Sequence, residues 1–427
     1  MNAENSPRRD VGALDATMVT VGAMIGSGIF QTPAEVARRA GSTSRALLVW
    51  ALGAALSLLG ALSLAEPGAA LPGTGGLYVY LRRAYGPLVA FLFGWAMLLV
   101  LVPSSVAFFA GVTARHLAPV VGVREAVVSS VVIALVAALN VTGVRRAARV
   151  QSVTAAARAV GLCVAALAAF GADAPSHHEA VSAASGELLA AVVPVLWAYD
   201  GWIDVTSIAG EVRDPGRTIP RALVLGTTGV AAVYMLIVAG YHRALGTAAL
   251  AASTAPGNAL GAHLAGAQGM RAMAALVTLS AFGGCMIGML TGTRVIAAMG
   301  ADGDFAPSLA RVGPAGTPDR AIAVTASLAL AYALSPFVGR FAEVFVVGAW
   351  PFYALGALAT IVLRVREPEL ARPYRVPGYP WTVLGFFAAT VLMLVSFARS
   401  DPGLVAASLG LIALGAPVYV LGKRFVR

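Results

Sequence analysis

The chain has 427 residues, of which 59% are hydrophobic and only 12% are charged, and its mean hydropathy is +0.81. Soluble domains carry about 25% charged residues, so this composition excludes an ordinary soluble protein and predicts an all-α membrane protein. The net charge of +10 could suggest a nucleic acid partner. The basic residues lie in short loops between apolar segments, which indicates a role in membrane topology instead.

Apolar segments long enough to cross a bilayer recur along the whole chain. They form one transmembrane domain (1–427), with five helices in 11–171, five in 187–364 and two more in 380–422. The start of the chain lacks the pattern of a cleavable signal peptide. We expect about twelve transmembrane helices, at residues 12–38, 46–71, 87–115, 124–143, 151–171, 187–210, 220–243, 271–299, 321–338, 342–364, 380–397 and 403–422.

The distribution of basic residues predicts the orientation of these helices. All of them are arginines except Lys423. If the N-terminus is cytoplasmic, nineteen basic residues fall on that side and nine on the other, with Arg158 and Arg294 inside or at the end of a segment. A two-to-one excess in short loops predicts that both termini are cytoplasmic.

The first apolar segment contains the run Gly-Ala-Met-Ile-Gly-Ser-Gly-Ile-Phe at residues 22–30. Each glycine in a helix interior costs about 1 kcal/mol relative to alanine, so this run weakens the helix at its middle. A helix that breaks inside a bilayer needs partners for the freed backbone groups, and in transporters the partner is often the substrate. We therefore expect a break at Gly26, Ser27 and Gly28.

The sixth segment contains a similar interruption at residues 197–202, where Asp200 stands beside Gly201 in an apolar run. Breaks in two helices that lie five segments apart are typical of a midplane binding site in an inverted-repeat transporter. The alternative interpretation is that these glycines only allow neighbouring helices to pack closely.

Five motifs in this order resemble the amino acid–polyamine–organocation superfamily, and most closely its L-type amino acid transporter branch. They lie at residues 22–33, 60–66 with 75–81, 199–202 with 210–217, 293–294 with 302–304, and 372–380. The resemblance covers nearly the whole chain. It implies the five-plus-five inverted-repeat fold of sodium-symporter-like carriers, with discontinuous helices 1 and 6.

An amino acid presents a carboxylate and an ammonium group, so its site needs hydrogen-bond donors and acceptors around one small volume. Backbone amides freed at residues 26–28, with a half-helix that resumes at Ile29, suit the carboxylate. Carbonyls freed around residues 24–25 and 197–199 suit the ammonium. The candidate substrate-binding residues are either implied by the resemblance or lie at the two breaks. They are Ile25, Gly26, Ser27, Gly28, Trp197, Ala198, Tyr199 and Asp200.

Other residues near the breaks have two interpretations each. Trp197 falls where the family has an aromatic lid, and the alternative is an ordinary packing residue. Asp200 is expected to cap the second half of the sixth helix, so that a neutral L-amino acid is the expected substrate. Ser280, with Phe282 and Gly283, either lines the pocket or packs between helices.

Three further polar residues are expected to have structural roles. Glu66 should bond to a neighbouring helix. Glu211 and Arg217 should belong to a polar network on the cytoplasmic side.

Arg158 falls, by the resemblance, where many family members have a lysine and where sodium-coupled relatives bind a cation. A fixed positive charge there would replace sodium. Arginine does not release its proton, so Arg158 cannot carry a coupling proton. This favours alternating-access exchange or facilitated movement over proton-coupled symport, which stays open as an alternative. The other interpretation is that Arg158 extends to the cytoplasmic interface.

The sequence lacks the residue patterns that an enzyme or a channel would need. No metal-ligand spacing, cofactor motif or acid–base pair indicates an enzyme, and no repeated filter indicates a channel. An amino-acid sensor without net transport has the same sequence features as a carrier. Cys163 and Cys285 both lie within apolar segments, so we expect no disulfide-linked heavy subunit. A chain that works alone, as a monomer in a bacterial inner membrane, is the simplest expectation.

Overall fold

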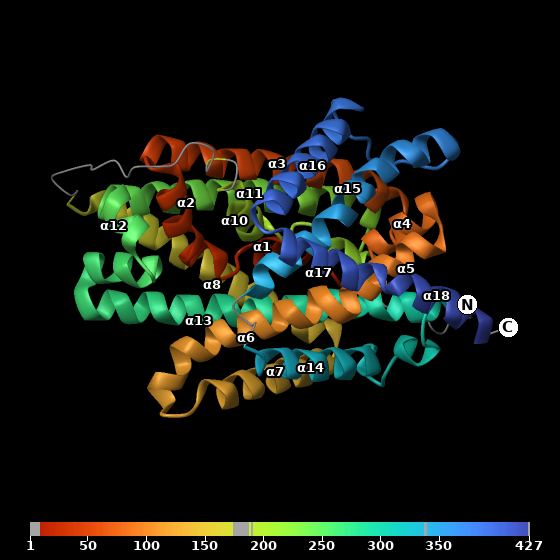
Figure 1. Ribbon diagram of the computed structural model, residues 1–427, viewed down its shortest axis with the longest axis horizontal. Helices are drawn as coiled ribbons and strands as arrows, with labels where there is room; N and C mark the ends of the chain where they lie inside the picture. The colour runs from red at the N-terminus through yellow and green to blue at the C-terminus, as the bar shows by residue number, and fades with distance from the viewer. Residues whose placement is uncertain (1–8, 174–187, 189–190, 337–339, 426–427) are drawn as a thin grey trace.

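The computed structural model describes residues 9–173, 188, 191–336 and 340–425. These residues form helices and loops with no strand among them, and the single β-bridge joins Val11 to Val212. Figure 1 shows the helices packed into one bundle. They are α1 (Ala13–Met24), η2 (Gly28–Phe30), α2 (Thr32–Ala40), α3 (Thr43–Ala70), α4 (Leu77–Tyr85), α5 (Pro87–Ala96), η3 (Met97–Leu101), α6 (Val102–Val121), α7 (Glu125–Val141), α8 (Val144–Gly171), α10 (Val192–Tyr199), η4 (Asp204–Glu211), α11 (Pro215–Leu245), α12 (Thr247–Ala252), α13 (Pro256–Ala301), η5 (Pro307–Ala310), α14 (Asp319–Ala333), α15 (Phe341–Arg366), α16 (Trp381–Ser400), α17 (Pro402–Ala413) and α18 (Gly415–Phe425).

Eight helical stretches in the described part of the chain are long and apolar enough to cross a membrane, and α1 and α7 are shorter apolar helices. Every one of the twelve predicted segments contains a helix, although 187, 189–190 and 337–338 lie outside the described residues. The all-α, multi-pass class is therefore confirmed. The count of twelve crossings, the two five-helix groups and their residue limits stay predictions.

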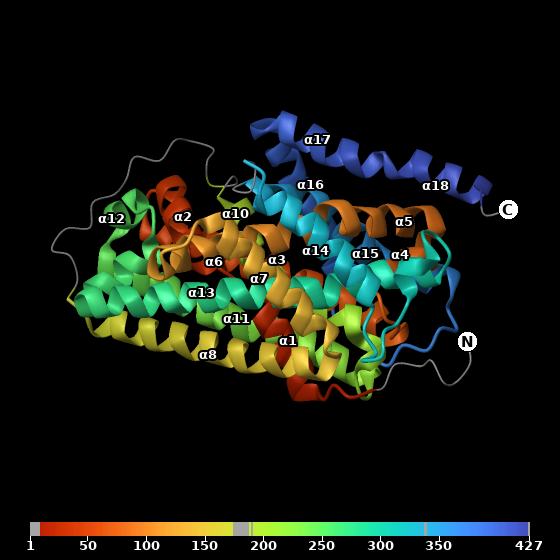
Figure 2. The same ribbon diagram turned by 90° about the horizontal axis from the view of Figure 1, so that it is seen from below.

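The bundle has two recognisable ends. Helices α2 and α12 lie at one end, and α4, the start of α5 and α18 lie at the other (Figures 1 and 2). We call these the α2 end and the α4 end. Helix α1 lies between them and packs against α8, α11 and α13, so its break is surrounded by protein.

Local sequence explains how the chain turns between elements at the α2 end. Helix α2 ends at Gly41, whose φ of 72° lies in the left-handed region that glycine adopts without strain. Ser42 then begins α3, because its hydroxyl accepts a hydrogen bond from the amide of Arg45 at 3.4 Å. This capping is the usual role of serine before a helix.

The N-terminal segment is attached to the end of η4 by backbone pairing. The amide of Val11 donates to the carbonyl of Glu211 at 3.0 Å, and the amide of Arg213 donates to the carbonyl of Val11 at 2.9 Å. Val11, two residues before α1, is thus bonded on both sides of Val212, the residue after η4.

Glu66 bonds to neighbouring elements, which confirms the role predicted for it. Arg364 in α15 donates Nε and Nη2 to its two carboxylate oxygens at 2.8 and 2.6 Å. The amide of Val376 donates to Oε2 at 2.8 Å, and Arg372 lies 3.5 Å from Oε1. The buried carboxylate therefore holds α3, α15 and the loop before α16 together.

We expect Glu66→Gln to lower the thermal unfolding temperature of the detergent-solubilised protein. The change removes charge-assisted hydrogen bonds, each of which contributes about 1.5–3 kcal/mol. Glu343→Gln is the control, since the Glu343 carboxylate pairs with Arg340 at 2.9 Å while its side chain is 47% exposed. Such exposed pairs contribute about 0–1 kcal/mol. Equal shifts in the two variants would contradict this account of Glu66.

Candidate functional site

The first predicted break is present, with one correction to its length. Helix α1 ends at Met24, η2 covers only Gly28–Phe30, and the α-helix resumes at Thr32 instead of Ile29. A three-residue turn has too few aligned peptides to act as a half-helix dipole. The local backbone amides, and not a helix dipole, are therefore what this break offers to a ligand.

Three consecutive amides at this break lack hydrogen-bond acceptors. Among the described residues, the N–H groups of Ser27, Gly28 and Ile29 donate no hydrogen bond, although all three residues are buried. Buried backbone amides are almost always paired. Successive unpaired amides form a concave site that suits an anion such as a carboxylate.

The carbonyls on the other side of the break already have partners. The carbonyl of Met24 accepts from the Tyr234 hydroxyl and from the amide of Gly26, both at 2.8 Å. The carbonyl of Ile25 accepts from Nη1 of Arg158 at 2.6 Å. The carbonyl of Met24 thus already accepts two hydrogen bonds and that of Ile25 one, so the first break has fewer free acceptor positions than expected. Binding of an ammonium group by these carbonyls stays a prediction.

The second predicted break lies between α10 and η4. Helix α10 ends at Tyr199, Gly201 has a φ of 101°, and η4 begins at Asp204. The carbonyl of Trp197 accepts from the amide of Asp200 at 3.2 Å. The carbonyls of Ala198 and Tyr199 accept no hydrogen bond from the described residues, so this break supplies acceptors where the first supplies donors.

The two breaks touch each other, and glycine makes the contact possible. A Cβ atom at Gly201 would lie 2.7 Å from the carbonyl carbon and oxygen of Ala23. A Cβ atom at Gly28 would lie 3.0 Å from Cα of Ala198. Both distances are shorter than van der Waals contact, so each broken helix approaches the other through a position without a side chain.

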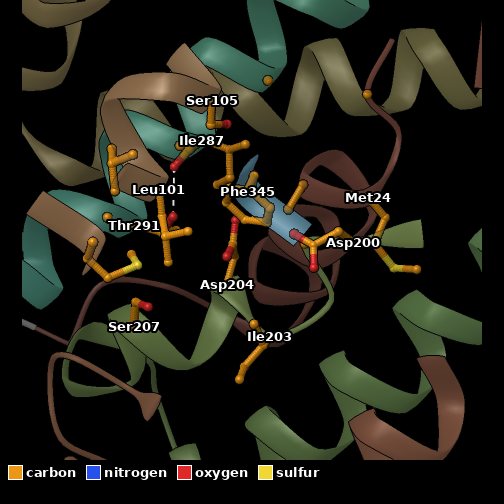
Figure 3. Close-up of a pocket in the computed structure, with 18 of the residues that line it drawn as sticks. Met24, Leu101, Ser105, Asp200, Ile203, Asp204, Ser207, Ile287, Thr291 and Phe345 are labelled. Atoms are coloured by element: carbon orange, nitrogen blue, oxygen red, sulfur yellow. Dashed lines mark hydrogen bonds between the residues drawn. The ribbon is translucent and has the colours of Figure 1, made fainter. Parts of the chain in front are cut away.

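A cavity of about 80 Å³ opens beside this contact. It is bounded by both breaks and by residues of α5, η3, α6, α13 and α15 (Figure 3). Gly26, Gly28, Trp197, Ala198 and Asp200 line it, as expected for the candidate binding residues.

Four other candidate binding residues lie outside the lining: Ile25, Ser27, Tyr199 and Ser280. Ser27 contributes one of the three unpaired amides at the first break. The Tyr199 ring packs against Trp50 and Tyr234, with centroids 5.7 and 5.1 Å away. A binding role for these candidates stays a prediction.

Trp197 belongs to an aromatic cluster at one side of the cavity. Its ring stacks on Phe109 at a centroid distance of 6.0 Å. It makes edge contacts with Phe108 at 5.7 Å and with Phe345 at 5.3 Å. These rings come from α6, α10 and α15, and they cover the cavity on the side of α10.

Asp200 does not cap the second half of the sixth helix, which corrects the prediction. The residue before η4 is Ile203, and η4 has no side-chain cap. Instead, the Asp200 carboxyl lines the cavity, adjoins the Tyr353 hydroxyl, and leaves Oδ1 without a hydrogen bond. Oδ1 of Asp200 therefore remains free to bind a ligand group.

Asp204, Thr291 and Tyr353 also line the cavity, and none of them was among the predicted site residues. Asp204 was visible as a second carboxylate in the apolar run of the sixth segment. Thr291 and Tyr353 give no signal in the sequence, since hydroxyl groups are common in membrane helices and only packing shows which ones face a cavity.

Arg158 is buried where α1, α8 and α13 meet, and it does not reach the interface, so the alternative of an interfacial arginine is wrong. Nη1 donates to the carbonyl of Ile25 at 2.6 Å and to that of Ser280 at 3.4 Å, and Nε donates to the carbonyl of Thr154 at 3.0 Å. Nη2 has no partner among the described residues. A guanidinium group thus sits against the first break and is bound only by backbone carbonyls.

Ser280 and Gly283 belong to the surroundings of Arg158, and neither they nor Phe282 line the cavity. A Cβ atom at Gly283 would lie 2.7 Å from Cζ and Nη1 of Arg158. The structure thus places this part of α13 against Arg158, and a binding role for Ser280 stays a prediction. The cavity begins one residue later, at Gly284, and continues to Val295.

Ion pairs close the protein on the α4 side of the cavity. Arg294 Nε donates to Glu211 Oε1 at 2.7 Å, and both side chains are buried. Arg82 Nε donates to Asp304 Oδ2 at 3.0 Å. Glu211 thus belongs to a polar network, in which its partner is Arg294. A place for Arg217 in this network, and its cytoplasmic position, stay predictions.

No group of three or more His, Cys, Asp or Glu residues that could hold a metal ion occurs in the described ranges.

Residues 11–415 match the model of the amino acid permease family. The serine/threonine exchanger SteT of Bacillus subtilis (strain 168) is 29% identical, with 97% of each chain covered. The human b(0,+)-type amino acid transporter 1 is 30% identical, over 87% of this chain and 79% of its own. The human large neutral amino acids transporter small subunit 2 is 29% identical, over 97% and 80%.

We expect Gly283→Ala to destabilise the protein through Arg158. The added methyl group would overlap the guanidinium group, and overpacking of this kind costs about 1–3 kcal/mol. Gly410→Ala in α17 is the control, because nothing lies within 4 Å of a Cβ atom there. The double variant Gly283→Ala/Arg158→Ala should unfold at a higher temperature than additive single effects predict. Strict additivity would show that the two residues do not interact.

Proposed function

The chain belongs to the amino acid permease family, and we propose that it is a secondary transporter that moves amino acids across a membrane by alternating access. The observation that carries this proposal is the meeting of two broken helices at one cavity, with unpaired amides on one break and unpaired carbonyls on the other. This combination of donors and acceptors matches a free amino acid, which has a carboxylate and an ammonium group on one carbon atom.

The substrate carboxylate binds at the first break. The amides of Ser27, Gly28 and Ile29 donate to it, and Gly28 lets the ligand approach the backbone. The substrate ammonium binds at the second break, where the carbonyls of Ala198 and Tyr199 and the carboxylate of Asp200 accept from it. The two charged ends of one molecule thereby satisfy backbone groups that the bilayer cannot.

Alternating access needs a closure on each side of the substrate. The aromatic cluster around Trp197 forms the closure toward the α2 end. The pairs Arg294–Glu211 and Arg82–Asp304 form the closure toward the α4 end. Trp197 acts as the lid, since it lies two residues before the end of α10 and lines the cavity, whereas Tyr199 does not.

Arg158 supports exchange or facilitated movement without sodium. Its guanidinium group donates to the carbonyl of Ile25, an oxygen that a bound cation would otherwise need. Because arginine stays protonated in proteins, Arg158 supplies a constant charge and cannot deliver a proton in each cycle. The alternative of proton-coupled symport would need another proton-carrying residue.

The proposed setting is a bacterial inner membrane with both termini in the cytoplasm, which places the α4 end on the cytoplasmic side. The excess of arginines in the loops of that side supports this orientation. Cys285 is buried and Cys163 lies within α8, so neither is placed for a disulfide with a second subunit. We propose that the chain works without a disulfide-linked partner, as a monomer. The expected neutral L-amino acids stay within this proposal.

Gly28→Leu should abolish amino acid binding while the protein still inserts and stays monodisperse. The new side chain would begin 3.0 Å from Cα of Ala198 and would fill the space in front of the three amides. The measurement is a thermal-shift screen over the twenty common amino acids. Gly410→Leu, on an exposed surface of α17, is the control and should keep the ligand shifts. Retained affinity in Gly28→Leu would disprove the carboxylate site.

Uptake into proteoliposomes should depend on amino acid preloaded inside, and not on sodium or on a pH gradient. This follows from the fixed charge of Arg158. In Arg158→Lys, uptake should become sensitive to the pH gradient, because a buried lysine can release its proton. Accumulation driven by a pH gradient alone in the unmodified protein, with its loss in Arg158→Ala, would favour the symport alternative. Binding without any flux would favour an amino-acid sensor.

A further inference from the structure

One helical span in the wall of the cavity contains a turn of unusual geometry. Elements α5, η3 and α6 form a continuous helix over Pro87–Ala118. Within it, η3 is a π-helical turn, in which the amide of Val102 donates to the carbonyl of Met97, five residues earlier. Single π turns inside α-helices are rare and occur frequently at functional sites. This turn lies at the cavity, because Met97 and Leu101 both line it.

The span presents a regular stripe of residues to the cavity. Apart from Val102, its lining residues are spaced four apart, and they are Phe93, Met97, Leu101, Ser105 and Phe109. In a regular α-helix, each step of four residues advances by about 40° around the axis, so the fifth residue would lie about 160° from the first. A π turn holds about one residue more than an α turn, which takes back about 100° of this rotation. The π turn therefore keeps the stripe on one face, and Figure 3 shows Leu101 and Ser105 at this wall.

Pro103 explains why the helix widens at this place. Proline has no N–H, and its ring clashes with the carbonyl of the residue four positions earlier, which here is Leu99. The carbonyl of Leu99 therefore cannot receive the usual α-helical hydrogen bond, and it cannot keep the usual α-helical position. Inside a membrane, a carbonyl that loses its helical partner needs another partner within the protein.

Tyr332 supplies that partner from α14. Its hydroxyl donates to the carbonyl of Leu99 at 2.6 Å. Its ring packs against Phe341 at the start of α15, with the two centroids 5.3 Å apart. Tyr332 is not one of the residues that line the cavity, so its hydrogen bond to the backbone is the contact through which it can affect a substrate.

We propose that Tyr332 is a positioning residue for the side chain of the substrate. By binding the carbonyl of Leu99 it maintains the π turn, and the π turn directs Met97 and Leu101 into the cavity. This inference rests on the proposed transport of amino acids and adds a residue outside the binding site that controls its selectivity.

The geometry of the site determines which part of the substrate depends on Tyr332. The carboxylate binds at the first break and the ammonium group at the second, so the substrate side chain faces the remaining walls, which include the stripe. If the turn returns to an α-helix, Met97 and Leu101 rotate away from the cavity. The side chain then loses apolar contacts, while the two charged groups of the substrate keep theirs.

The test compares norvaline with glycine, which has the same two charged groups and no side chain. Binding of each to the purified full chain is measured by calorimetry in detergent. Burial of one methylene group strengthens binding by about fourfold, so norvaline should bind at least about tenfold more tightly than glycine to the unmodified protein. In Tyr332→Phe this ratio should fall below about threefold, while the glycine affinity changes less than about twofold, because only the apolar contacts are lost.

Tyr85→Phe is the matched control. The Tyr85 hydroxyl also donates to a backbone carbonyl, that of Leu355 at 2.9 Å, and Tyr85 does not line the cavity. This variant should keep the norvaline-to-glycine ratio of the unmodified protein. Leu101→Ala removes one contact of the stripe directly and should lower the ratio. Adding Tyr332→Phe to Leu101→Ala should then have a smaller effect than Tyr332→Phe alone, since both act on the same contact. Full additivity would contradict the positioning role.

Pro103→Ala tests the π turn while Tyr332 stays in place. Alanine restores an N–H that can donate to Leu99 and removes the clash of the ring, so a regular α-helix can form. The norvaline-to-glycine ratio should fall as in Tyr332→Phe, whereas the thermal unfolding temperature should not fall. This variant also decides the question if Tyr332→Phe does not fold. An unchanged ratio in Pro103→Ala, or in a folded Tyr332→Phe, would overturn the role of Tyr332.

Two further results separate this inference from the function on which it rests. If norvaline binds no more tightly than glycine to the unmodified protein, or if Tyr332→Phe weakens both ligands equally, the role of Tyr332 is overturned and amino acid transport still stands. If none of the common amino acids binds, the proposed function itself fails.

Discussion

The structure depends on one constraint: a helix that breaks inside a membrane must find partners for its free backbone groups within the protein. At the first break, Tyr234 and Arg158 supply donors to the carbonyls of Met24 and Ile25. Among the described residues, none accepts from the amides of Ser27, Gly28 and Ile29, and none donates to the carbonyls of Ala198 and Tyr199. Within the described residues, the site is therefore the part of this backbone that the protein leaves unsatisfied.

Arg158 connects this constraint to the energetics of transport. A guanidinium group buried without a carboxylate is stabilised by several carbonyls at once, which fixes α8 against α1 and α13. Glycines 22 and 283 leave the space that the group occupies, since a Cβ atom at either would lie within 3.1 Å of it. The same residue thus positions the broken helix and supplies a charge that stays constant through the cycle.

The sequence predicted the helical class, both breaks and part of the cavity, because glycine patterns and hydropathy are local signals. It did not predict the role of Asp200, since whether an aspartate caps a helix depends on where the next helix begins, and η4 begins four residues later, at Asp204. Whether Ser280 lines the pocket or packs was left open, because the sequence does not show which face of α13 is turned toward the cavity and which toward Arg158. Tyr353 lies 153 residues after Asp200 in the sequence, and only the packed structure brings the two together.

The backbone pairing between Val11 and Val212 has a mechanical consequence. It joins the start of α1 to the end of η4 by two hydrogen bonds, while Gly201 seats the other end of η4 against Ala23 near the end of α1. Helix α1 and η4 are thus in contact near both of their ends. A rotation of α1 or η4 relative to the cavity must therefore move the other element as well, or break both sets of contacts. On the α4 side of the substrate, the first and sixth helices thus move as one rigid unit.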